Sequence, residues 1–432
     1  MERRKIRNAI ALASLTLALG LFTVACQEST ETPSSTSSGT GSPAPDSSKN
    51  LKLGSLLPST GDLAALGQPM IASVPILVKT VNGCGGINGA PVELVAANDQ
   101  TDPSAGTEAM TKLTTVDKVA GVVGSFGSSV SMAAAAVATR SKVMLISPGS
   151  TSPDFTKKAN EFQGFWARTA PSDAYQAPAL AKLAYDRGFR KVATIAINND
   201  YGVAFEKEFV TAFQKLGGTI VNEAKPVRYD PKATSLKSEA AAAFQDKPDA
   251  VAAIMYGETG SLILKSAYEQ GVSQGIPVLL TDGMYDEGLA AKVGKGQDGK
   301  FIATGVLGTI PGASGTALTD FSKIWEAELK RPVQAYAAHS WDAAALLVLA
   351  AEAAKRNTGE GIQSKLREIA NAPGEEVGDV CKALEMLRQG KDINYQGASG
   401  NVDIDENGDV IGTYDVWEVK PDGKIAKVGN VQ

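Results

Sequence analysis

Histidine is nearly missing from this chain. The 432 residues contain a single histidine, His339, in an apolar stretch beside Trp341, which is typical of a core or helix-capping residue rather than a catalytic one. The sequence also lacks a GxSxG nucleophile elbow, a phosphate-binding loop and any cluster with metal-ligand spacing. We therefore expect that the protein is not an enzyme and binds no metal or cofactor. A secreted hydrolase is the alternative, and it would have to use carboxylates alone for catalysis.

One acidic stretch, residues 403–409, has the aspartate, asparagine and glycine spacing that opens a calcium loop. The twelfth position of that loop, which should be a bidentate glutamate, is Tyr414. The flanks alternate apolar and polar residues, so the Asp405-Glu-Asn-Gly408 segment predicts a β-hairpin within 402–420 instead.

Cysteine is also scarce, and the 47 acidic residues slightly outnumber the 42 Lys and Arg residues. The formal net charge is −5, which argues against nucleic acid or an anionic membrane surface as the main partner. The three cysteines are Cys26, Cys84 and Cys381. Outside the cytoplasm the last two favour a disulfide that closes a very long loop, and two buried free thiols are the alternative.

The N-terminus reads as a targeting segment. A basic start precedes an apolar run from Ile10 to Ala25, which is short for a membrane span. Thr23-Val-Ala-Cys26 resembles a bacterial lipobox, so residues 1–25 are predicted to be a lipoprotein signal peptide and Cys26 the lipidated residue. An ordinary signal peptide cut elsewhere, or an uncleaved anchor, is the alternative. Residues 26–50 are rich in Ser, Thr, Pro and Gly and predict a disordered tether outside the cytoplasm.

The remaining chain alternates short apolar strands with helices. The hydrophobic content of 43% is enough for large cores. Strands are expected at 51–57, 92–97, 121–124 and 143–146, and again at 192–197, 250–255, 277–280 and 301–306, with helices between them. This pattern predicts two α/β lobes, each a parallel sheet with helices on both faces.

The stretch 121–151 is the centre of the predicted site. Ser128 or Ser129 is expected to cap the helix 130–140, and Ser147-Pro-Gly-Ser-Thr151 follows the next strand. Both loops leave the carboxyl ends of parallel strands, where open α/β sheets bind ligands. Free amides and hydroxyls at a helix N-terminus suit a carboxylate. Ordinary Ser- and Gly-rich βα turns are the alternative.

Several segments together resemble the branched-chain and neutral amino-acid binding proteins of ABC importers. They read LGSLLPSTGDLAALG, GGINGAPVEL, VVGSFGSS, ISPGSTSP, NNDYG and LLTDG, and NGCGGING is closest to the cyanobacterial type. The resemblance implies the type I periplasmic-binding fold, in which two doubly wound three-layer lobes are joined by three hinge crossings. Lobe one would comprise 51–169 and 308–399, and lobe two 170–307 and 400–432.

The resemblance also implies residue roles. Ser128 and Thr151, with Ser150 in the same loop, would bind the ligand carboxylate, and the Gly149 carbonyl would accept from the ammonium. Asp282 would pair with that ammonium. The aromatic residues Tyr201 and Tyr256 would close over the ligand, and the side-chain contacts would come from Leu66 and Phe126.

These inferences predict a monomeric receptor that delivers a neutral, possibly branched-chain, amino acid to an ABC permease and its ATPase. A binder of urea, short amides or small carboxylates is an alternative, and Asp282 favours an ammonium over these. A ligand sensor that acts on a signalling partner is a further alternative. Closure of two lobes over the ligand would bring both counter-charges together.

Overall fold

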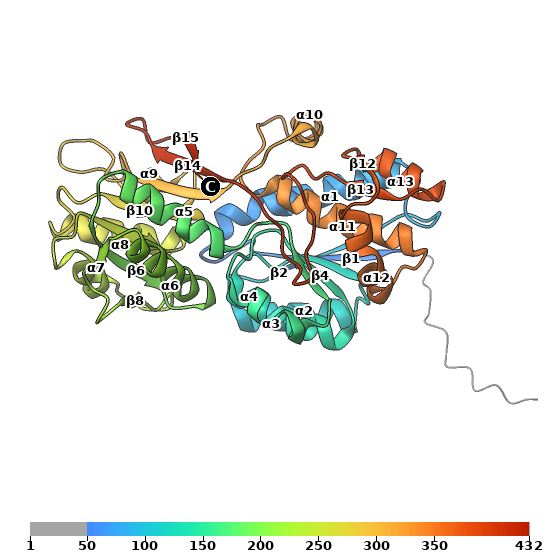
Figure 1. Ribbon diagram of the computed structural model, residues 1–432, viewed down its shortest axis with the longest axis horizontal. Coiled ribbons are helices and arrows are strands. Elements are labelled where there is room, and N and C mark those ends of the chain that lie inside the picture. Colours follow the sequence, from blue (N-terminus) through green and yellow to red (C-terminus); the bar gives the residue numbers. More distant parts are fainter. Residues whose placement is uncertain (1–49, 432) are drawn as a thin grey trace, which may run out of the picture. The chain divides into compact units, whose positions relative to one another are not determined.

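A computed structural model describes residues 50–431, so the predicted signal peptide, the lipidation site Cys26 and most of the predicted tether lie outside the described residues. The described chain is organised around two large sheets (Figure 1). We call the elements around the first sheet lobe one and those around the second sheet lobe two. The structure confirms the predicted α/β class: the sheet of lobe one is parallel, and that of lobe two is parallel except for two antiparallel strands at one edge.

Lobe one contains a five-stranded parallel sheet in the order β2-β1-β3-β4-β5. The strands are β1 (Lys52–Leu57), β2 (Glu93–Asn98), β3 (Gly121–Gly124), β4 (Met144–Ser147) and β5 (Trp166–Arg168). The helices are α1 (Ala64–Gly83), α2 (Pro103–Thr115), α3 (Ser128–Ser141), α4 (Asp154–Lys157), α10 (Thr316–Leu329), α11 (Ala337–Ala354), α12 (Gly359–Ala370) and α13 (Val380–Arg388), with a 3-10 turn at Ala159–Phe162.

The strands of this sheet are buried on both faces, as expected for a parallel sheet between helices. Val122 and Leu145 pack into one core with α2 and α3, whereas Val123 and Ile146 pack into the other with α1 and α11. Helix α11 is apolar around its whole circumference and is buried almost throughout. Helix α1 is also long and apolar enough to cross a membrane, but it packs against α11 inside lobe one.

Lobe two contains the larger sheet, in the order β15-β14-β11-β10-β9-β6-β7, with β8 also paired to β6. The strands are β6 (Lys191–Ile197), β7 (Thr219–Ile220), β8 (Val227–Tyr229), β9 (Ala250–Ile254), β10 (Val278–Leu280), β11 (Leu307–Pro311), β14 (Tyr414–Val419) and β15 (Ile425–Val431). Its helices are α5 (Asp173–Asp186), α6 (Asp200–Lys215), α7 (Lys237–Phe244), α8 (Gly257–Glu269) and α9 (Leu289–Val293), with a 3-10 turn at Asp282–Met284.

The chain passes between the lobes at 169–172, 312–315 and 410–413. The second and third crossings lie later than predicted, because β11 pairs with β10 and β14 in lobe two and residues 400–409 stay on lobe one. The crossings are bonded to one another: the Gly312 N–H donates to the Thr413 carbonyl (2.8 Å), and the Tyr414 hydroxyl donates to the Ser172 carbonyl (2.8 Å).

Two local predictions were wrong. Residues 301–306 form turns rather than a strand, and the strand of that region is β11. The predicted hairpin at Asp405–Gly408 is a turn on lobe one, whose Gly408 carbonyl accepts from the Arg168 N–H (2.9 Å). The true hairpin is formed by β14 and β15, with its turn at 420–424.

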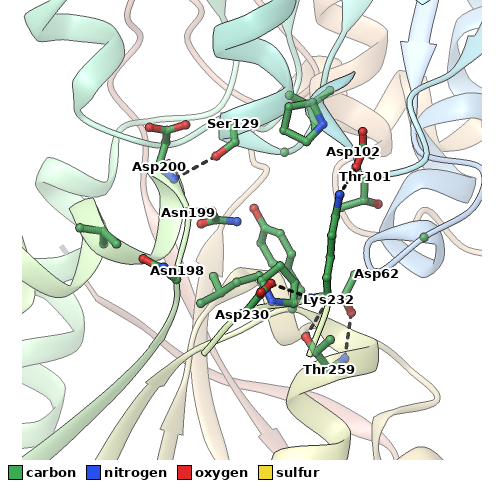
Figure 2. A pocket seen from close by; sticks show the side chains of 18 of the residues that line it. Asp62, Thr101, Asp102, Ser129, Asn198, Asn199, Asp200, Asp230, Lys232 and Thr259 are labelled. Carbon is green, nitrogen blue, oxygen red and sulfur yellow. Dashed lines mark hydrogen bonds and ion pairs between the residues drawn. The ribbon is translucent and has the colours of Figure 1, made fainter. Parts of the chain in front are cut away.

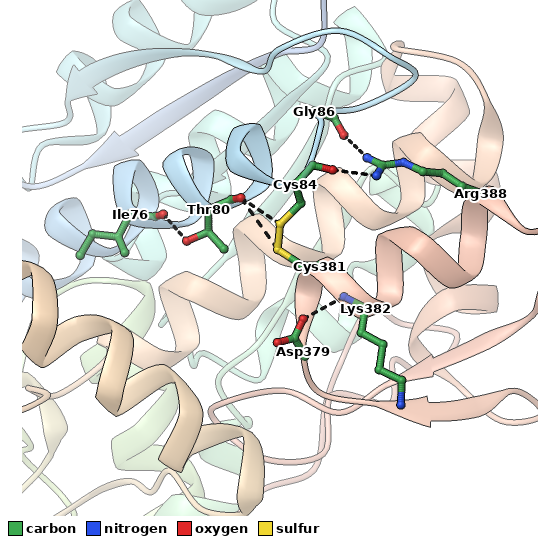
Figure 3. Close-up of a disulfide and its surroundings, with 8 residues drawn as sticks. All are labelled: Ile76, Thr80, Cys84, Gly86, Asp379, Cys381, Lys382 and Arg388. Carbon is green, nitrogen blue, oxygen red and sulfur yellow. Dashed lines mark hydrogen bonds between the residues drawn. A yellow bond between two sulfur atoms is a disulfide. The ribbon is translucent and has the colours of Figure 1, made fainter.

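Cys84 and Cys381 form a disulfide, as Figure 3 shows, with their Cα atoms 5.6 Å apart. This separation is ordinary for a bridged pair. The bond joins the end of α1 to the first turn of α13, and Arg388 reinforces the junction by donating to the Cys84 carbonyl (2.7 Å) and the Gly86 carbonyl (2.6 Å). In the chain, α13 connects β12 (Glu375–Val377) to β13 (Ile393–Tyr395), and these two strands form a small parallel sheet in lobe one.

Candidate functional site

The N-terminus of α3 has no side-chain cap. Gly127 occupies the N-cap position, so the prediction of Ser128 or Ser129 as the cap was wrong. Both serines stand in the first turn. The Ser128 hydroxyl accepts from the Ser152 N–H (3.3 Å), and the Ser129 hydroxyl accepts from the Asp200 N–H of lobe two (2.9 Å). An uncapped helix N-terminus attracts an anion through its free amides and its dipole.

The loop after β4 is held in place by hydroxyls. The Ser147 hydroxyl accepts from the N–H groups of Gly149 (3.2 Å) and Ser150 (2.9 Å). The Ser150 hydroxyl is buried and donates to the Phe126 carbonyl (2.9 Å), so its contacts are with the loop before α3. A Cβ on Gly149 would lie 2.3 Å from the Phe126 ring, and only glycine fits there without displacing that ring.

A small cavity lies where these loops of lobe one meet lobe two. It is lined by Leu63, Phe126, Gly127, Ser128, Gly149, Thr151, Tyr201, Tyr256, Asp282 and Gly283. The structure thus brings together Phe126, Ser128, Gly149, Thr151, Tyr201, Tyr256 and Asp282 of the predicted site. Leu66 and Ser150 do not line it, since Leu66 is buried in α1 and its place is taken by Leu63.

The cavity is closed tightly in this arrangement. Its free volume is about 10 Å³, roughly the room for one water molecule. The rings of Tyr201 and Tyr256 stack with their centroids 5.5 Å apart and form the wall on lobe two. A ligand larger than water therefore enters while the two walls are apart, and the aromatic side chains must rotate to hold it once the walls meet.

Asp282 is the acidic group of this cavity. It is buried, and its carboxylate accepts from the Tyr201 hydroxyl (2.9 Å), the Gln176 amide (3.1 Å) and the Tyr336 hydroxyl (3.0 Å). Burial raises the pKa of Asp282, while the three donors oppose that rise. Sequence reasoning missed Gln176 and Tyr336, which come from α5 and from the residue before α11.

A second acid, Asp173, lies beside Asp282 at the start of α5. Its side chain is fully buried, and within residues 50–431 its carboxylate has no hydrogen bond of normal geometry, although the nearby Thr151 side chain partly stabilises its charged form. Its backbone N–H donates to the Thr151 carbonyl (2.8 Å), which ties it to the predicted site. Burial raises the pKa of Asp173 well above its usual range, and the charge of Asp282 raises it further. A buried acid pair of this kind favours a cationic partner, which would let both carboxylates ionise.

A larger chamber of about 1190 Å³ lies outside the small cavity and shares Gly127 and Tyr256 with it. Polar contacts cross this chamber from lobe to lobe (Figure 2). Lys232 of lobe two pairs with Asp102 of lobe one (Nζ to Oδ2, 2.7 Å). The Asp200 N–H donates to the Ser129 hydroxyl as described above, and the Asp200 carbonyl accepts from the Ser152 hydroxyl (2.9 Å).

Asp62 makes the most extensive of these contacts. Helix α8 has no side-chain cap of its own at Tyr256. The Asp62 carboxylate, from lobe one, accepts from the N–H groups of Glu258 (2.7 Å) and Thr259 (2.9 Å) and from the Thr259 hydroxyl (2.6 Å). It therefore caps a helix of the other lobe, and Figure 2 shows it facing Thr259.

The described residues contain no group of three or more His, Cys, Asp or Glu side chains placed to hold a metal ion. At the former calcium candidate, the Asp405 carboxylate accepts from the N–H groups of Asn407 and Asp409, as in an Asx turn. Asp409 pairs with Arg168 (2.7 Å), so the acidic residues of this segment serve the loop structure.

Comparison with known proteins adds relatives of similar length. The chain is 28% identical over 372 residues to the chemotactic signal transduction system substrate-binding protein BasB of Halobacterium salinarum, covering 82% of this chain and 83% of that protein. It is 27% identical over 320 residues to the Leu/Ile/Val-binding protein homolog 1 of Brucella suis, covering 72% and 81%.

Solved structures have the same fold. The leucine-binding protein LivK of Thermotoga maritima matches with a TM-score of 0.74 and 25% identity, over 88% of this chain and 99% of that one. The branched-chain amino-acid binding protein LivJ of Streptococcus pneumoniae, solved with isoleucine, matches with a TM-score of 0.72 and 20% identity, over 89% and 100%. A solute-binding protein of R. palustris, solved with benzoate, matches with a TM-score of 0.68 and 22% identity, over 88% and 96%.

The family model described as "Receptor family ligand binding region" matches residues 72–422. The chain therefore belongs to this family, as a type I periplasmic solute-binding protein of the branched-chain amino-acid and related-solute group, whose members bind ligands and are not enzymes.

Proposed function

We propose that this protein captures a free neutral amino acid between its lobes and delivers it to an ABC importer. One observation carries the proposal: a single cavity has an uncapped helix N-terminus with Ser128 and Thr151 on one side and Asp282 on the other, and the charge of buried Asp173 acts on Asp282. A zwitterion has one negative and one positive group, and both must be paired once water is excluded.

Each part of this cavity has a role in the proposal. The amide and hydroxyl of Ser128 and the hydroxyl of Thr151 bind the carboxylate at the positive end of α3. Asp282 binds the ammonium, Asp173 adds negative charge next to Asp282 without lining the cavity, and the Gly149 carbonyl is a further acceptor. Tyr201 and Tyr256 cover the ligand from lobe two, and Leu63 and Phe126 contact its side chain.

The names of the relatives support an apolar side chain. The Thermotoga protein is named for leucine and the Brucella protein for leucine, isoleucine and valine, and isoleucine is bound in the Streptococcus protein. Leu63 and Phe126 are the apolar residues of the cavity wall on lobe one, and they suit such a side chain. Leucine and isoleucine are therefore the first ligands to test.

Lobe closure is the proposed binding step. Neither lobe holds both counter-charges, so the ligand favours the form in which the lobes meet. We further propose that the protein is of the cyanobacterial type of this family, that residues 1–25 are a lipoprotein signal peptide, and that lipidated Cys26 anchors the body outside the cytoplasm. The tether, residues 26–50, would let the folded body move away from the membrane surface while it stays anchored.

The test compares leucine with analogues that lack one of its two charged groups. Residues 50–432 are titrated by calorimetry with L-leucine, with 4-methylpentanoate, which lacks the ammonium, and with 3-methylbutylamine, which lacks the carboxylate. We expect leucine to bind at least a hundredfold more tightly than either analogue. Asp282→Asn should weaken leucine by on the order of 2–5 kcal/mol, because an ammonium loses its partner.

Binding of 4-methylpentanoate should change little in Asp282→Asn, since it has no ammonium to lose. If leucine and all other neutral amino acids leave the protein unbound while benzoate binds, the zwitterion proposal is wrong and an aromatic acid is the ligand. The name of the halobacterial relative favours a second role, presentation of the ligand to a chemotactic partner. Genes for a permease and an ATPase beside this gene would favour transport.

A further inference from the structure

A separate cavity of about 250 Å³ lies at the hinge. Lobe two supplies β11, β14, β15 and the residue after the 3-10 turn, and lobe one supplies α10, the following loop and the start of α11. The lining residues that matter most here are Tyr285, Ala313, Leu318, Tyr336, His339 and Trp417. Because both lobes supply its walls, its shape depends on how the lobes are placed.

The lining is mainly apolar and aromatic. Tyr285 and Trp417 meet edge to face with their centroids 5.6 Å apart, and Ile310, Leu318 and Val333 supply aliphatic surface. The charged lining residues Asp415 and Lys427 pair with each other (2.7 Å). The volume lies just below the usual range of small-molecule pockets, about 300–1,000 Å³. A compact uncharged molecule of one ring therefore matches both size and polarity.

His339 gives this cavity a polar group without a partner. Its side chain is 2% exposed, and its Nδ1 atom has no hydrogen bond among the described residues. Burial lowers the pKa of His339 to about 4, so the imidazole is neutral near pH 7 and offers one donor and one acceptor. A buried polar group left unpaired costs free energy, which a hydroxyl-bearing occupant would recover.

Tyr336 connects this cavity with the ligand site. Its ring lines the hinge cavity, while its hydroxyl donates to Asp282 in the cleft (3.0 Å). The ring also meets Phe126, another cleft residue, edge to face with centroids 4.9 Å apart. An occupant that packs against Tyr336 at the hinge therefore acts on a residue that orients the acid of the cleft.

We propose that the hinge cavity is a second small-molecule site, which takes a neutral single-ring compound bearing a hydroxyl and stabilises the arrangement in which the lobes meet. Its occupation then tightens binding in the cleft, and by linkage the cleft ligand tightens binding at the hinge by the same factor. The hinge site itself is independent of which solute the cleft binds. Only the coupling between the sites rests on the proposed function.

The probe is 4-methylphenol, titrated by calorimetry and by quenching of tryptophan fluorescence into residues 50–432. We expect saturable binding with a dissociation constant on the order of 1 mM, roughly 4 kcal/mol of binding free energy. Toluene, which cannot bond to His339, should bind at least threefold more weakly. Absence of saturable binding of 4-methylphenol up to its solubility limit overturns the proposal.

Two variants locate the probe. Ala313→Phe fills the hinge cavity from a partly exposed loop position and should weaken 4-methylphenol at least tenfold. The matched control, Ala353→Phe, places the same ring at a partly exposed position near the end of α11 and should leave binding unchanged. Leu318→Trp is a second filler if Ala313→Phe does not fold, as judged by thermal melting.

Asp282→Asn separates the two sites. If 4-methylphenol binding survives Ala313→Phe but is lost in Asp282→Asn or displaced by leucine, the probe occupies the cleft and the hinge site is refuted. If the probe binds at the hinge as expected, saturating 4-methylphenol should tighten leucine binding at least threefold. Unchanged leucine affinity would refute the coupling. If the protein does not bind leucine at all, the cleft proposal is refuted, but the titration with 4-methylphenol still tests the hinge site.

Discussion

Asp62 offers the most direct test of lobe closure. Its carboxylate makes three hydrogen bonds to the start of α8, and all three cross between the lobes. Replacing a helix-capping residue with alanine typically costs about 0.5–2 kcal/mol. Burial raises the pKa of Asp62, a sign that desolvation offsets part of the gain. We therefore expect Asp62→Ala to destabilise the closed form by about 1 kcal/mol and to weaken ligand binding roughly fivefold.

The assay is calorimetric titration with L-leucine, or with the amino acid that a thermal-shift screen selects. Asp62→Asn keeps an acceptor and should lose less than Asp62→Ala. Asp154→Ala is the matched control, because Asp154 lines the same chamber but its side chain pairs only within lobe one, with Lys157 (2.8 Å). Equal dissociation constants for wild type and Asp62→Ala, or an equal loss in Asp154→Ala, would refute the closure argument.

Three further changes test other parts of the structure. Affinity for a zwitterion should be constant at high pH and fall as the pH drops through the raised pKa of the Asp282 site, since a proton then competes with the ammonium; titrations from pH 4.5 to 8 should show this, and a flat profile would contradict it. Gly149→Ala should weaken binding at least tenfold in the same assay without lowering the melting temperature much, because its methyl group displaces Phe126 into the cavity. Replacing Cys84 and Cys381 with serine should cost on the order of 2–5 kcal/mol in urea unfolding, and a thiol count on unreduced, unfolded protein should find neither cysteine free.

The parts of the site that follow strand ends were accessible from sequence. Ser128, Gly149, Thr151 and Asp282 all follow the carboxyl ends of parallel strands, and a parallel sheet gathers the segments after its strands at one edge. The strand-loop-helix pattern alone indicated Ser128 and the loop 147–151, whereas the roles of Gly149 and Asp282 came from the resemblance to amino-acid binding proteins. The pattern placed Ser150 there as well, although tertiary hydrogen bonds turn that hydroxyl toward Phe126.

The residues that were missed lack such a local signal. Asp173 and Gln176 lie on α5, an alanine-rich helix with Pro178 inside it that the sequence pattern did not separate from its surroundings. Tyr336 reaches Asp282 from a left-handed backbone position (φ 61°), which is rare for a tyrosine. Its role depends on a contact across 54 positions of the chain, and nothing in the neighbouring residues indicates it.

Turn signals placed the last hairpin wrongly for a related reason. Both Asp405–Gly408 and Pro421–Gly423 have turn-forming residues. The sequence predicts the hairpin at the first of them, because an Asn-Gly pair favours hairpin turns. The hydrogen bond from Arg168 to the Gly408 carbonyl keeps the first turn on lobe one. Strand pairing, which the sequence does not encode locally, decides between two such turns.

The bonds among the three crossings have a consequence for measurement. Gly312 is tied to Thr413 and Tyr414 to Ser172, so the three connecting segments form one narrow strap and bend together. The separation of the lobes then has essentially a single degree of freedom. One pair of fluorophores, with one dye on the exposed face of α2 and the other on α7, is enough to follow the opening of the whole molecule in real time.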